Sequence, residues 1–307
     1  MLSRFAYYFD EVAKLGSIRK AAEVLNIAAS AIDRQILQAE ERLGTPLFER
    51  LPKGLRLTAA GEVMVHTVRQ WRRDYDRLVE QIDDMKGLRR GRIPVAAVEG
   101  ASDFAAAQLA GFRDLYPNIS FSVTVAGSRA VAELVLSGEC EIGLTFNPPQ
   151  IHSLRIEETV IFQIGVVVPT DHALARRAEI SFAELADYPL IMPDKKLSLR
   201  AIIDVLWAKT FGQDGRCAFE VNSIAVMKAL VLRGQGIGLL TRLDVLSEVK
   251  AGTLAFIALR DDAVPLSILS LITASGRSLS PPASLLTRAI VNGMLDLRSL
   301  AEQYAWS

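Results

Sequence analysis

Residues 58–86 have the pattern of one long helix whose apolar side chains follow a strict seven-residue repeat. Successive apolar positions are separated by four and three residues in alternation, which is the spacing of a coiled-coil seam. A single helix cannot cover such a seam, so we expect a second copy of the chain to pack against it; packing on its own domain is the alternative. The seam consists of Met64, Val68, Trp71, Tyr75, Leu78, Ile82 and Met85.

Length and composition exclude several classes of protein. The 307 residues, 50% of them hydrophobic, are enough for two or three domains. The cysteines, Cys140 and Cys217, are too few for a disulfide framework, and the three histidines share no metal-ligand spacing. No apolar run is long enough to span a membrane, and Asp10 and Glu11 interrupt the segment where a signal peptide is apolar. We therefore expect a cytoplasmic protein with no metal, cofactor or membrane partner.

The N-terminal part is basic and has the pattern of short helices. Residues 1–92 carry 17 Lys and Arg against 13 Asp and Glu, which favours a polyanion-binding module. Gly16 ends a first amphipathic helix, Ser17 can cap a second, and Asn26 suits the turn before a third helix over residues 29–43. Pro52-Lys53-Gly54 predicts the turn of a small hairpin. This order is that of a helix-turn-helix, whose third helix offers Ser30, Asp33, Arg34, Gln35 and Gln38 to base edges.

From Gly91 onward the pattern changes to alternating strands and helices, which predicts an α/β architecture with a largely parallel sheet, in two halves. The expected strands are Ile93–Val98, Ile119–Val125, Ile142–Phe146, Ile164–Val168, Leu190–Met192, Gly238–Leu240 and Leu266–Ile272. The expected helices are Asp103–Leu115, Ala130–Leu136, Leu199–Phe211 and Ile224–Leu232.

Several strings of residues carry a resemblance to a known family, the LysR-type transcriptional regulators. The likeness covers nearly the whole chain, and its landmarks are a Leu-Phe-x-Arg after a Leu-Gly pair and a Leu-Thr-x-Ala-Gly. The matching strings are RKAAEVLNIAASAIDRQI (Arg19–Ile36), ERLGTPLFER (Glu41–Arg50), LRLTAAG (Leu55–Gly61), RDLYPNISFSV (Arg113–Val123), PTDHALA (Pro169–Ala175) and GQGIGLL (Gly234–Leu240).

The resemblance implies three domains. These are a winged helix-turn-helix over residues 1–58, a linker and dimerisation helix over 59–90, and an effector domain over 91–307 that resembles a periplasmic binding protein. In the effector domain we expect subdomain I over about 91–167 and 268–307 and subdomain II over about 168–267. The chain crosses between them near Val167–Pro169 and Leu266–Ile268. The resemblance also implies a dimer or a tetramer and leaves contact with RNA polymerase open.

The resemblance assigns DNA contacts to the third helix and the wing. Ser30 and Arg34 are the expected direct contacts with bases, and Lys53 and Arg56 the expected contacts with phosphate or the minor groove. Ala29 and Asp33 depart from the Gln and Ser common in the family, so either the operator is unusual or Asp33 accepts from cytosine or orients Arg34. Arg50 can contact DNA or form an ion pair within the domain. The full expected set is Ser17, Ser30, Asp33, Arg34, Gln35, Lys53 and Arg56.

A small-molecule effector is expected in the cleft between the two α/β halves. Ligands of such folds bind beyond the carboxyl ends of strands, where helix N-termini offer free N–H groups. Ser102 and Ser128 are predicted to cap helices there, which favours an anionic effector, although each serine can equally be a cap alone. The expected contacts are Gly100, Ser102, Gly127, Ser128, Asn147, Ser198, Asn222 and Ser223.

The sequence argues against two functions other than that of a ligand-responsive regulator. A cytosolic α/β enzyme without DNA binding needs a catalytic motif, and the sequence has no GxSxG, P-loop or metal motif, so no catalytic residue is expected. A small-molecule-binding protein of the transport type needs a secretion signal and has no use for residues 1–90. Gly234-x-Gly236-x-Gly238 follows a helix and precedes a strand, which is the wrong order for a dinucleotide fingerprint. Cys140 is either inert or a redox sensor.

Overall fold

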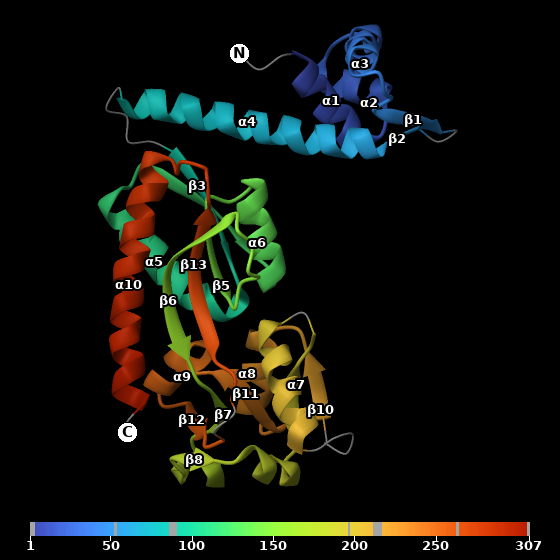
Figure 1. Cartoon of the computed structure of the whole chain (residues 1–307). Helices are drawn as coiled ribbons and strands as arrows, with labels where there is room; N and C mark the ends of the chain where they lie inside the picture. The colour runs from blue at the N-terminus through green and yellow to red at the C-terminus, as the bar shows by residue number, and fades with distance from the viewer. Residues whose placement is uncertain are drawn as a thin grey trace. The chain divides into compact units, whose positions relative to one another are not determined.

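The computed structural model describes residues 4–51, 54–85, 91–195, 197–210, 217–261 and 264–305, without the side chains of 73, 76, 77, 79–85 and 300–305. The chain divides into two compact units, Met1–Leu88 and Arg89–Ser307 (Figure 1). Among the described residues, no helix combines the length and the apolar character needed to cross a membrane.

The first unit is a helix-turn-helix followed by a hairpin and a long helix. Gly16 and Asn26, both at positive φ, end the first two helices, and the Ser17 side chain caps the second by accepting from the Lys20 N–H. The hairpin is antiparallel. It packs against the turn between α1 and α2, where the Leu55 N–H donates to the Gly16 carbonyl at 2.8 Å. Its elements are α1 (Arg4–Leu15), α2 (Ile18–Leu25), α3 (Ala29–Leu43), β1 (Phe48–Leu51), β2 (Gly54–Leu57) and α4 (Ala59–Met85).

A buried carboxylate fixes α4 to α1. The Asp10 side chain accepts from Arg69 at 2.8 Å and Arg72 at 2.6 Å, both on α4, and pairs with Lys14 at 2.9 Å. Burial alone would raise the pKa of Asp10, but the contacts with Arg69 and Lys14 outweigh it and lower the pKa below its ordinary value. The Arg72 guanidinium also lies over the Tyr7 ring. The first half of α4 is thereby part of the helix-turn-helix unit.

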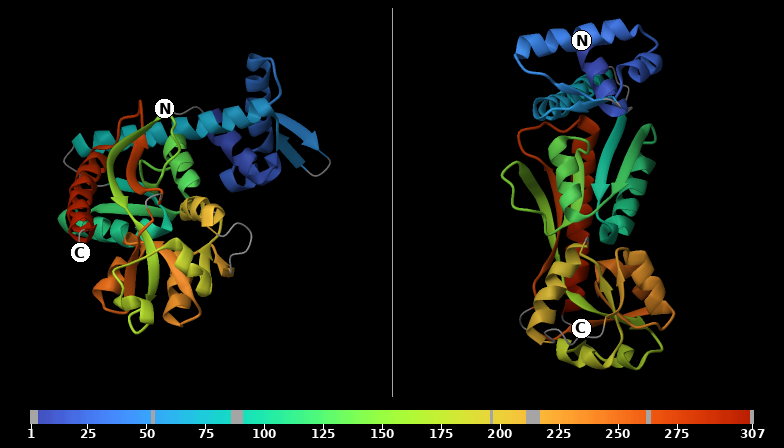
Figure 2. Two further views of the ribbon diagram at one scale, coloured as in Figure 1. Left: turned by 60° about the horizontal axis from the view of Figure 1, so that its bottom comes forward. Right: turned by 90° about the vertical axis from the view of Figure 1, so that its right-hand side faces the viewer.

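The second unit contains two sheets, each with its own core. The first is five-stranded in the order β4-β3-β5-β13-β6, with α6 packed on β5 and β13, and α10 packed on β6 and α5 (Figures 1 and 2). Its elements are β3 (Gly91–Ala97), η1 (Glu99–Ala101), α5 (Ser102–Leu115), β4 (Ile119–Val125), α6 (Ser128–Ser137), β5 (Ile142–Phe146), β6 (Leu154–Phe162), β13 (Ser267–Ala274) and α10 (Pro281–Ala305).

The second sheet is six-stranded in the order β10-β9-β11-β7-β12-β8. Helix α8 packs on β9 and β7, and α9 packs on β12. The elements are β7 (Ile164–Pro169), η2 (Ala173–Arg176), β8 (Glu179–Ile180), η3 (Phe182–Asp187), β9 (Leu190–Pro193), α7 (Ser198–Thr210), β10 (Cys217–Val221), α8 (Ile224–Leu232), β11 (Ile237–Thr241), η4 (Leu243–Val245), α9 (Leu246–Lys250) and β12 (Leu254–Leu259).

The α/β class with an N-terminal winged helix-turn-helix is confirmed, but the expectation of a largely parallel sheet is wrong. Strands β3, β4 and β5 run parallel, whereas β13 pairs antiparallel with both β5 and β6 because it returns from the second sheet. The first crossing lies between Phe162 and Ile164, earlier than the expected Val167–Pro169, since β7 already belongs to the second sheet. The second crossing lies between Leu259 and Ser267.

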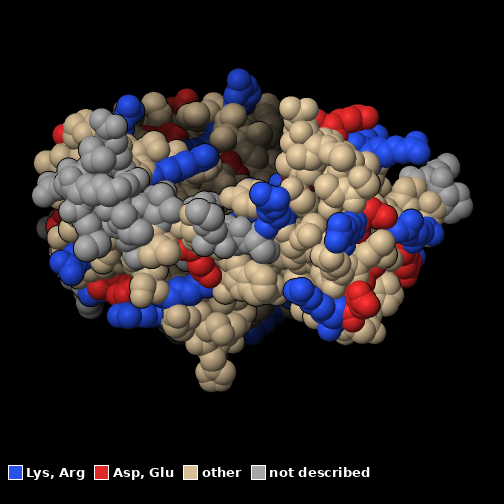
Figure 3. All heavy atoms as spheres, turned by 90° about the horizontal axis from the view of Figure 1, so that it is seen from above, with Lys and Arg blue, Asp and Glu red and all other residues tan. Residues whose placement is uncertain are grey.

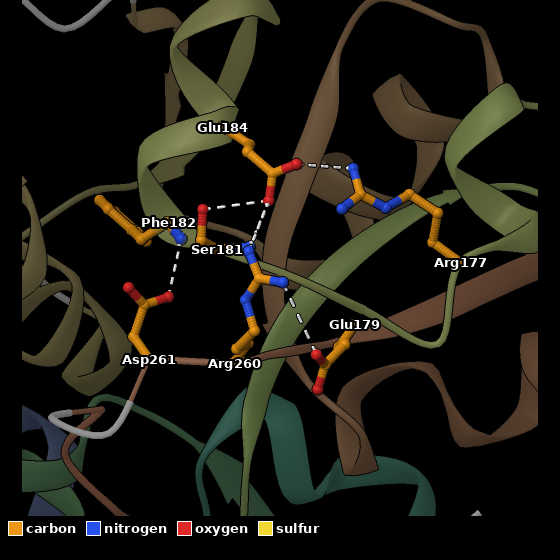
Figure 4. Close-up of polar contacts among 7 residues, drawn as sticks. All are labelled: Arg177, Glu179, Ser181, Phe182, Glu184, Arg260 and Asp261. Atoms are coloured by element: carbon orange, nitrogen blue, oxygen red, sulfur yellow. Dashed lines mark hydrogen bonds and ion pairs between the residues drawn. The ribbon is translucent and has the colours of Figure 1, made fainter.

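A polar cluster holds the short strand β8 and the helix η3 at one corner of the second sheet (Figure 4). The Glu184 carboxylate accepts from the Ser181 N–H at 2.9 Å and from Arg177 at 2.8 Å. Arg260 pairs with Glu184 at 3.4 Å and with Glu179 at 3.8 Å. Because the hydrogen bond from Arg177 is the largest contribution, the pKa of Glu184 is lowered to about 2.

Glu184→Gln should remove a source of acid sensitivity. A carboxyl whose folded-state pKa is lowered adds stability above its unfolded pKa of 4.5, and this stability is lost as the pH falls towards about 2. In urea unfolding, the wild type should be more stable than Glu184→Gln at about pH 6, and the gap should narrow towards about pH 3. Glu133→Gln, which breaks an exposed helical ion pair with Arg129, is the control and should leave the profile unchanged. A constant gap across this range would contradict the assignment.

Candidate nucleic-acid interface and ligand cleft

The exposed face of α3 carries the predicted base-reading side chains. Ser30 and Arg34 are exposed, and Gln35 is half-buried, with its amide donating to Gln38 at 3.3 Å. All four line one surface groove together with Arg4 and Tyr8 of α1 and Ala31 of α3. The predicted cap residue Ser17 lies at the start of α2.

Charged residues next to the exposed face of α3 form ion pairs within the same unit. Asp33 pairs with Arg50 of β1 at 3.1 Å through one carboxylate oxygen, so in this structure its partner is the hairpin; a contact between Asp33 and a base stays a prediction. Of the two alternatives for Arg50, contact with DNA or an ion pair within the domain, the structure shows the ion pair. Arg56, opposite Glu49 in the hairpin, pairs with it at 2.6 Å. Lys53, predicted at the hairpin tip, lies outside the described residues.

Of Arg34, Arg50 and Arg56, Arg34 alone has no carboxylate partner among the described residues. Basic and acidic side chains are interspersed on the described part of the face that Figure 3 shows. Arg34 thus differs from Arg50 and Arg56, whose guanidinium groups are each engaged by a carboxylate of the same unit.

The predicted seam of α4 divides into a buried and an exposed part. Val68 is 0% exposed, and Met64 packs on the same core, so Val68 has no surface left for a partner. For the first part of the seam, the alternative is correct: these side chains of α4 pack on their own domain. Further along, Trp71 and Leu78 are each 50% exposed, with Tyr75 half-buried. The side chains of Ile82 and Met85 lie outside the described residues.

A cleft of about 810 Å3, its open mouth included, lies between the two sheets of the second unit. Five of the predicted effector contacts line it, namely Gly100, Gly127, Ser128, Ser198 and Asn222. The lining combines side chains from η1, α6 and β5 of the first subdomain with side chains from α7, α8 and η4 of the second. Apolar side chains make up much of the wall, among them Val125, Phe146, Leu199 and Ile224.

Three predicted contacts are used for internal hydrogen bonds and are absent from this lining. The Ser102 hydroxyl donates to the Val98 carbonyl at 3.4 Å. Asn147, at positive φ, accepts from the Ile268 N–H at 2.9 Å and so fastens the crossing strand β13. Ser223 caps α8 and donates to Glu99 at 2.8 Å.

The prediction that Ser102 and Ser128 cap their helices is also wrong. The residues before them, Ala101 and Gly127, hold the cap positions, and neither makes a side-chain cap bond. The Ser128 hydroxyl instead donates to the Phe146 carbonyl at 2.7 Å. Among the described residues, no cap side chain therefore accepts from the first N–H groups of α6.

Sequence reasoning missed two carboxylates in the cleft. Glu99 accepts from the Ser223 hydroxyl and, at 3.0 Å, from the Ala225 N–H, so it lies at the N-terminus of α8 in the opposite subdomain. Asp244 is 7% exposed and accepts through one oxygen from the Thr241 N–H and hydroxyl, both at 2.7 Å. Burial is the largest influence on Asp244 and raises its pKa to about 6.

Cys140 is buried, and burial, followed by the charge of Glu139, raises its thiol pKa to about 11. A thiol with such a pKa holds little thiolate at neutral pH, which favours the inert alternative.

Gly100 allows the two subdomains to approach at this point. A Cβ atom at position 100 would lie 2.2 Å from Asp244 Oδ1 and 3.4 Å from the Phe146 ring. Next to this contact, the Ser247 hydroxyl donates to Asp103 at 3.4 Å. The bonds of Glu99, the approach at Gly100 and the bond of Asp103 thus all join the same side of the first subdomain to the second.

Comparison with known proteins agrees with this geometry. Residues 4–62 match the family model "Bacterial regulatory helix-turn-helix protein, lysR family", and residues 86–294 match "LysR substrate binding domain". The chain is 30% identical over 249 residues to the uncharacterized HTH-type transcriptional regulator YybE of Bacillus subtilis, covering 79% of this chain and 83% of that protein.

Two solved structures share the fold. CbnR, in a full-length complex with its target DNA, has a TM-score of 0.66 at 20% identity and covers 94% of this chain and 99% of that one. The CcmR regulatory domain of Synechocystis, solved in complex with 2-PG, has a TM-score of 0.58 at 22% identity and covers 66% of this chain and 97% of that one.

A winged helix-turn-helix unit joined to a two-subdomain cleft unit defines a DNA-binding transcriptional regulator with an effector domain. The chain belongs to the LysR-type family of these regulators.

Gly100→Ala should destabilise the second unit, because the added methyl group overlaps a buried carboxylate that Thr241 holds in place. Overpacking of this kind costs about 1–3 kcal/mol of unfolding free energy in urea titrations. Gly111→Ala is the matched control, since a Cβ atom there meets nothing within 4 Å. Equal unfolding free energies for the two variants would show that the subdomains do not need this close approach.

Proposed function

We propose that this regulator reads operator DNA with the exposed face of α3, with Arg34 as the main source of sequence discrimination. The observation that carries this proposal is that Arg34 has no carboxylate partner among the described residues, whereas Arg50 and Arg56 are paired. An unpaired guanidinium can form the bidentate contact with guanine that distinguishes base pairs in the major groove. Ser30 and Gln35, in the same groove, supply shorter-range contacts. Such a protein acts where the chromosome is, so we place it in the cytoplasm.

Arg34→Ala should flatten the discrimination between operator variants by about 1–3 kcal/mol per affected base pair. The measurement is a gel-shift titration with the DNA upstream of the protein's own gene and with single-base variants of it. Arg42→Ala removes the same charge from the last turn of α3 and is the control. Lys53→Ala should instead weaken binding to all sequences alike and reduce the salt dependence by about one unit per subunit. If Arg34→Ala and Lys53→Ala behave identically, the assignment of Arg34 is wrong.

We further propose that the chain dimerises through the exposed part of the α4 seam. Trp71 and Leu78, each half exposed, lie seven residues apart on the same stripe of the helix, with Tyr75 between them. A second helix laid on this stripe would remove both side chains from water. Two subunits would also bring two copies of α3 to one operator, and a pair of dimers would make the tetramer.

Trp71→Asp combined with Leu78→Asp should convert the dimer to monomers and abolish operator binding, because two buried charges would lie in the interface. Molar mass from light scattering after size-exclusion chromatography gives the oligomeric state, and gel shifts give the affinity. Val63→Asp is the control, since Val63 is 69% exposed on the same helix but lies off the seam. An unchanged mass in the double variant would rule out this interface.

The cleft between the subdomains is the proposed effector site. Its support is that residues far apart in the sequence, from Gly100 to Asn222, line one space that both subdomains enclose. A ligand that prefers one separation of the subdomains would shift the equilibrium between two states of the regulator. A thermal-shift screen of small metabolites, followed by gel shifts with each stabilising compound, tests this proposal. The proposal fails if no stabilising compound changes operator binding.

A further inference from the structure

Two carboxylates from opposite subdomains meet where the subdomains join. Asp244 belongs to η4 of the second subdomain, and Gly100 of η1 approaches it so closely that a Cβ atom at position 100 would lie 2.2 Å from Asp244 Oδ1. Glu99, the neighbour of Gly100, adds negative charge that acts on Asp244. Two like charges repel strongly away from water, so ionisation of Asp244 opposes the approach of the first subdomain.

The Asp244 carboxylate is buried, and its hydrogen bonds come from neutral donors. It is 7% exposed, and the two hydrogen bonds that it accepts come from the N–H and the hydroxyl of Thr241. The basic group whose charge acts on Asp244 is Lys228 of α8, and the Lys228 Nζ pairs with Glu248 of α9 at 2.6 Å. Burial with so little compensation favours the protonated form of Asp244.

The elements packed against η4 add little positive charge. These elements are β11, which carries no titratable side chain, η1, which carries Glu99, and α9. On α9, Glu248 is held by Lys228, and Lys250 is exposed at the end of the helix. The surroundings of Asp244 therefore hold at least as much negative as positive charge.

Two further charged groups lie beside this region. Asp103 of α5 is a third carboxylate of the first subdomain on this side, and it accepts from the Ser247 hydroxyl at 3.4 Å. Arg242, which precedes η4, has its guanidinium over the Phe256 ring, 5.2 Å from the ring centre. Neither group forms a contact that would keep Asp244 ionised.

We propose that the contact between Gly100 and Asp244 is a pH-dependent switch, which closes the two subdomains when Asp244 is protonated and separates them when Asp244 ionises. In a separated arrangement water reaches the Asp244 carboxylate, and Glu99 lies further away, so ionisation costs less there. Because the closed arrangement holds the proton more tightly, a fall in pH draws the subdomains together. The switch goes beyond the proposed function, since it moves the walls of the cleft with no ligand bound.

The sign and size of the effect follow from linkage. The pKa of Asp244 is about 6 in the closed arrangement, against an ordinary value of 3.8. Closure therefore takes up a proton between these two values, and above about pH 7 it takes up almost none. The ratio of closed to separated molecules should rise roughly tenfold from about pH 7 to about pH 5.

The test measures the distance between two spin labels by pulsed electron paramagnetic resonance at a series of pH values. Cys217 of β10 is an exposed thiol of the second subdomain, and Glu133→Cys adds one on an exposed position of α6 in the first. Cys140 is buried and should stay unlabelled. Labelled chain is mixed with excess unlabelled chain, so that distances within one chain dominate. We expect the population at the shorter distance to gain roughly tenfold over the longer one from about pH 7 to about pH 5.

Two variants of the labelled chain separate Asp244 from histidines, which titrate in the same range. Asp244→Asn removes the charge but keeps an oxygen that can accept from Thr241, so it should stay closed at every pH. Glu99→Gln keeps an oxygen at the N-terminus of α8 but removes the like charge, so it should move the midpoint of the transition to lower pH. Asp103→Asn is the matched control, because it removes a carboxylate of the same side that is bonded to Ser247, and it should keep the wild-type midpoint.

Three results would overturn the proposal. The first is a distance distribution that is the same at about pH 5 and about pH 7 when position 244 is unchanged, or that shifts to longer distances at the lower pH. The second is a pH dependence that survives in Asp244→Asn. The third, which decides the matter if Asp244→Asn does not fold, is an equal midpoint in Glu99→Gln and Asp103→Asn.

Discussion

The arrangement of the effector unit depends on one carboxylate that accepts hydrogen bonds from the opposite subdomain. Glu99 follows strand β3 of the first sheet, yet its oxygen accepts from a hydroxyl and an N–H at the start of α8, which packs on the second sheet. The partial positive charge of the helix N-terminus stabilises the negative carboxylate and offsets its loss of hydration. Because this contact, the approach of Asp244 to Gly100 and the bond between Ser247 and Asp103 lie together, the separation of the two sheets is set on one side of the cleft. The remaining lining residues are positioned by that separation.

The DNA-binding unit uses its charges differently. Two acidic residues near the reading face, Asp33 and Glu49, are each paired with an arginine of the hairpin, which reduces their repulsion of DNA. These pairs also tie the hairpin to α3 and its strands to each other, so the wing has a defined place beside the recognition helix. They are exposed pairs, whose contribution to stability is small. Their main effect is on which cations remain available: Arg50 and Arg56 are engaged, whereas Arg34 has no carboxylate partner among the described residues.

Much of the architecture could be predicted from the sequence because its signals are local. Gly16, Ser17 and Asn26 mark helix ends within a few residues, and Ser128 and Ser198 begin the helices that follow strands, where ligand sites of such folds form. Strand β6 was missed because Arg155, Glu157 and Glu158 interrupt its apolar pattern. Strand β13 was predicted, but its antiparallel direction was not, because its partners lie far away in the chain. Glu99 was missed for the same reason, since Ser223 is 124 positions away and an isolated glutamate looks like a solvated surface residue. Contacts between distant segments leave no periodic trace in the sequence.

The buried Asp10 has a mechanical consequence. Arg69 and Arg72 hold it from α4, and Lys14 holds it from its own helix, so α1 and the first half of α4 are joined through one buried carboxylate. Helix α1 also packs against both α2 and α3. A rotation of α4 about its axis would therefore move α1 with it, and through α1 the recognition helix α3.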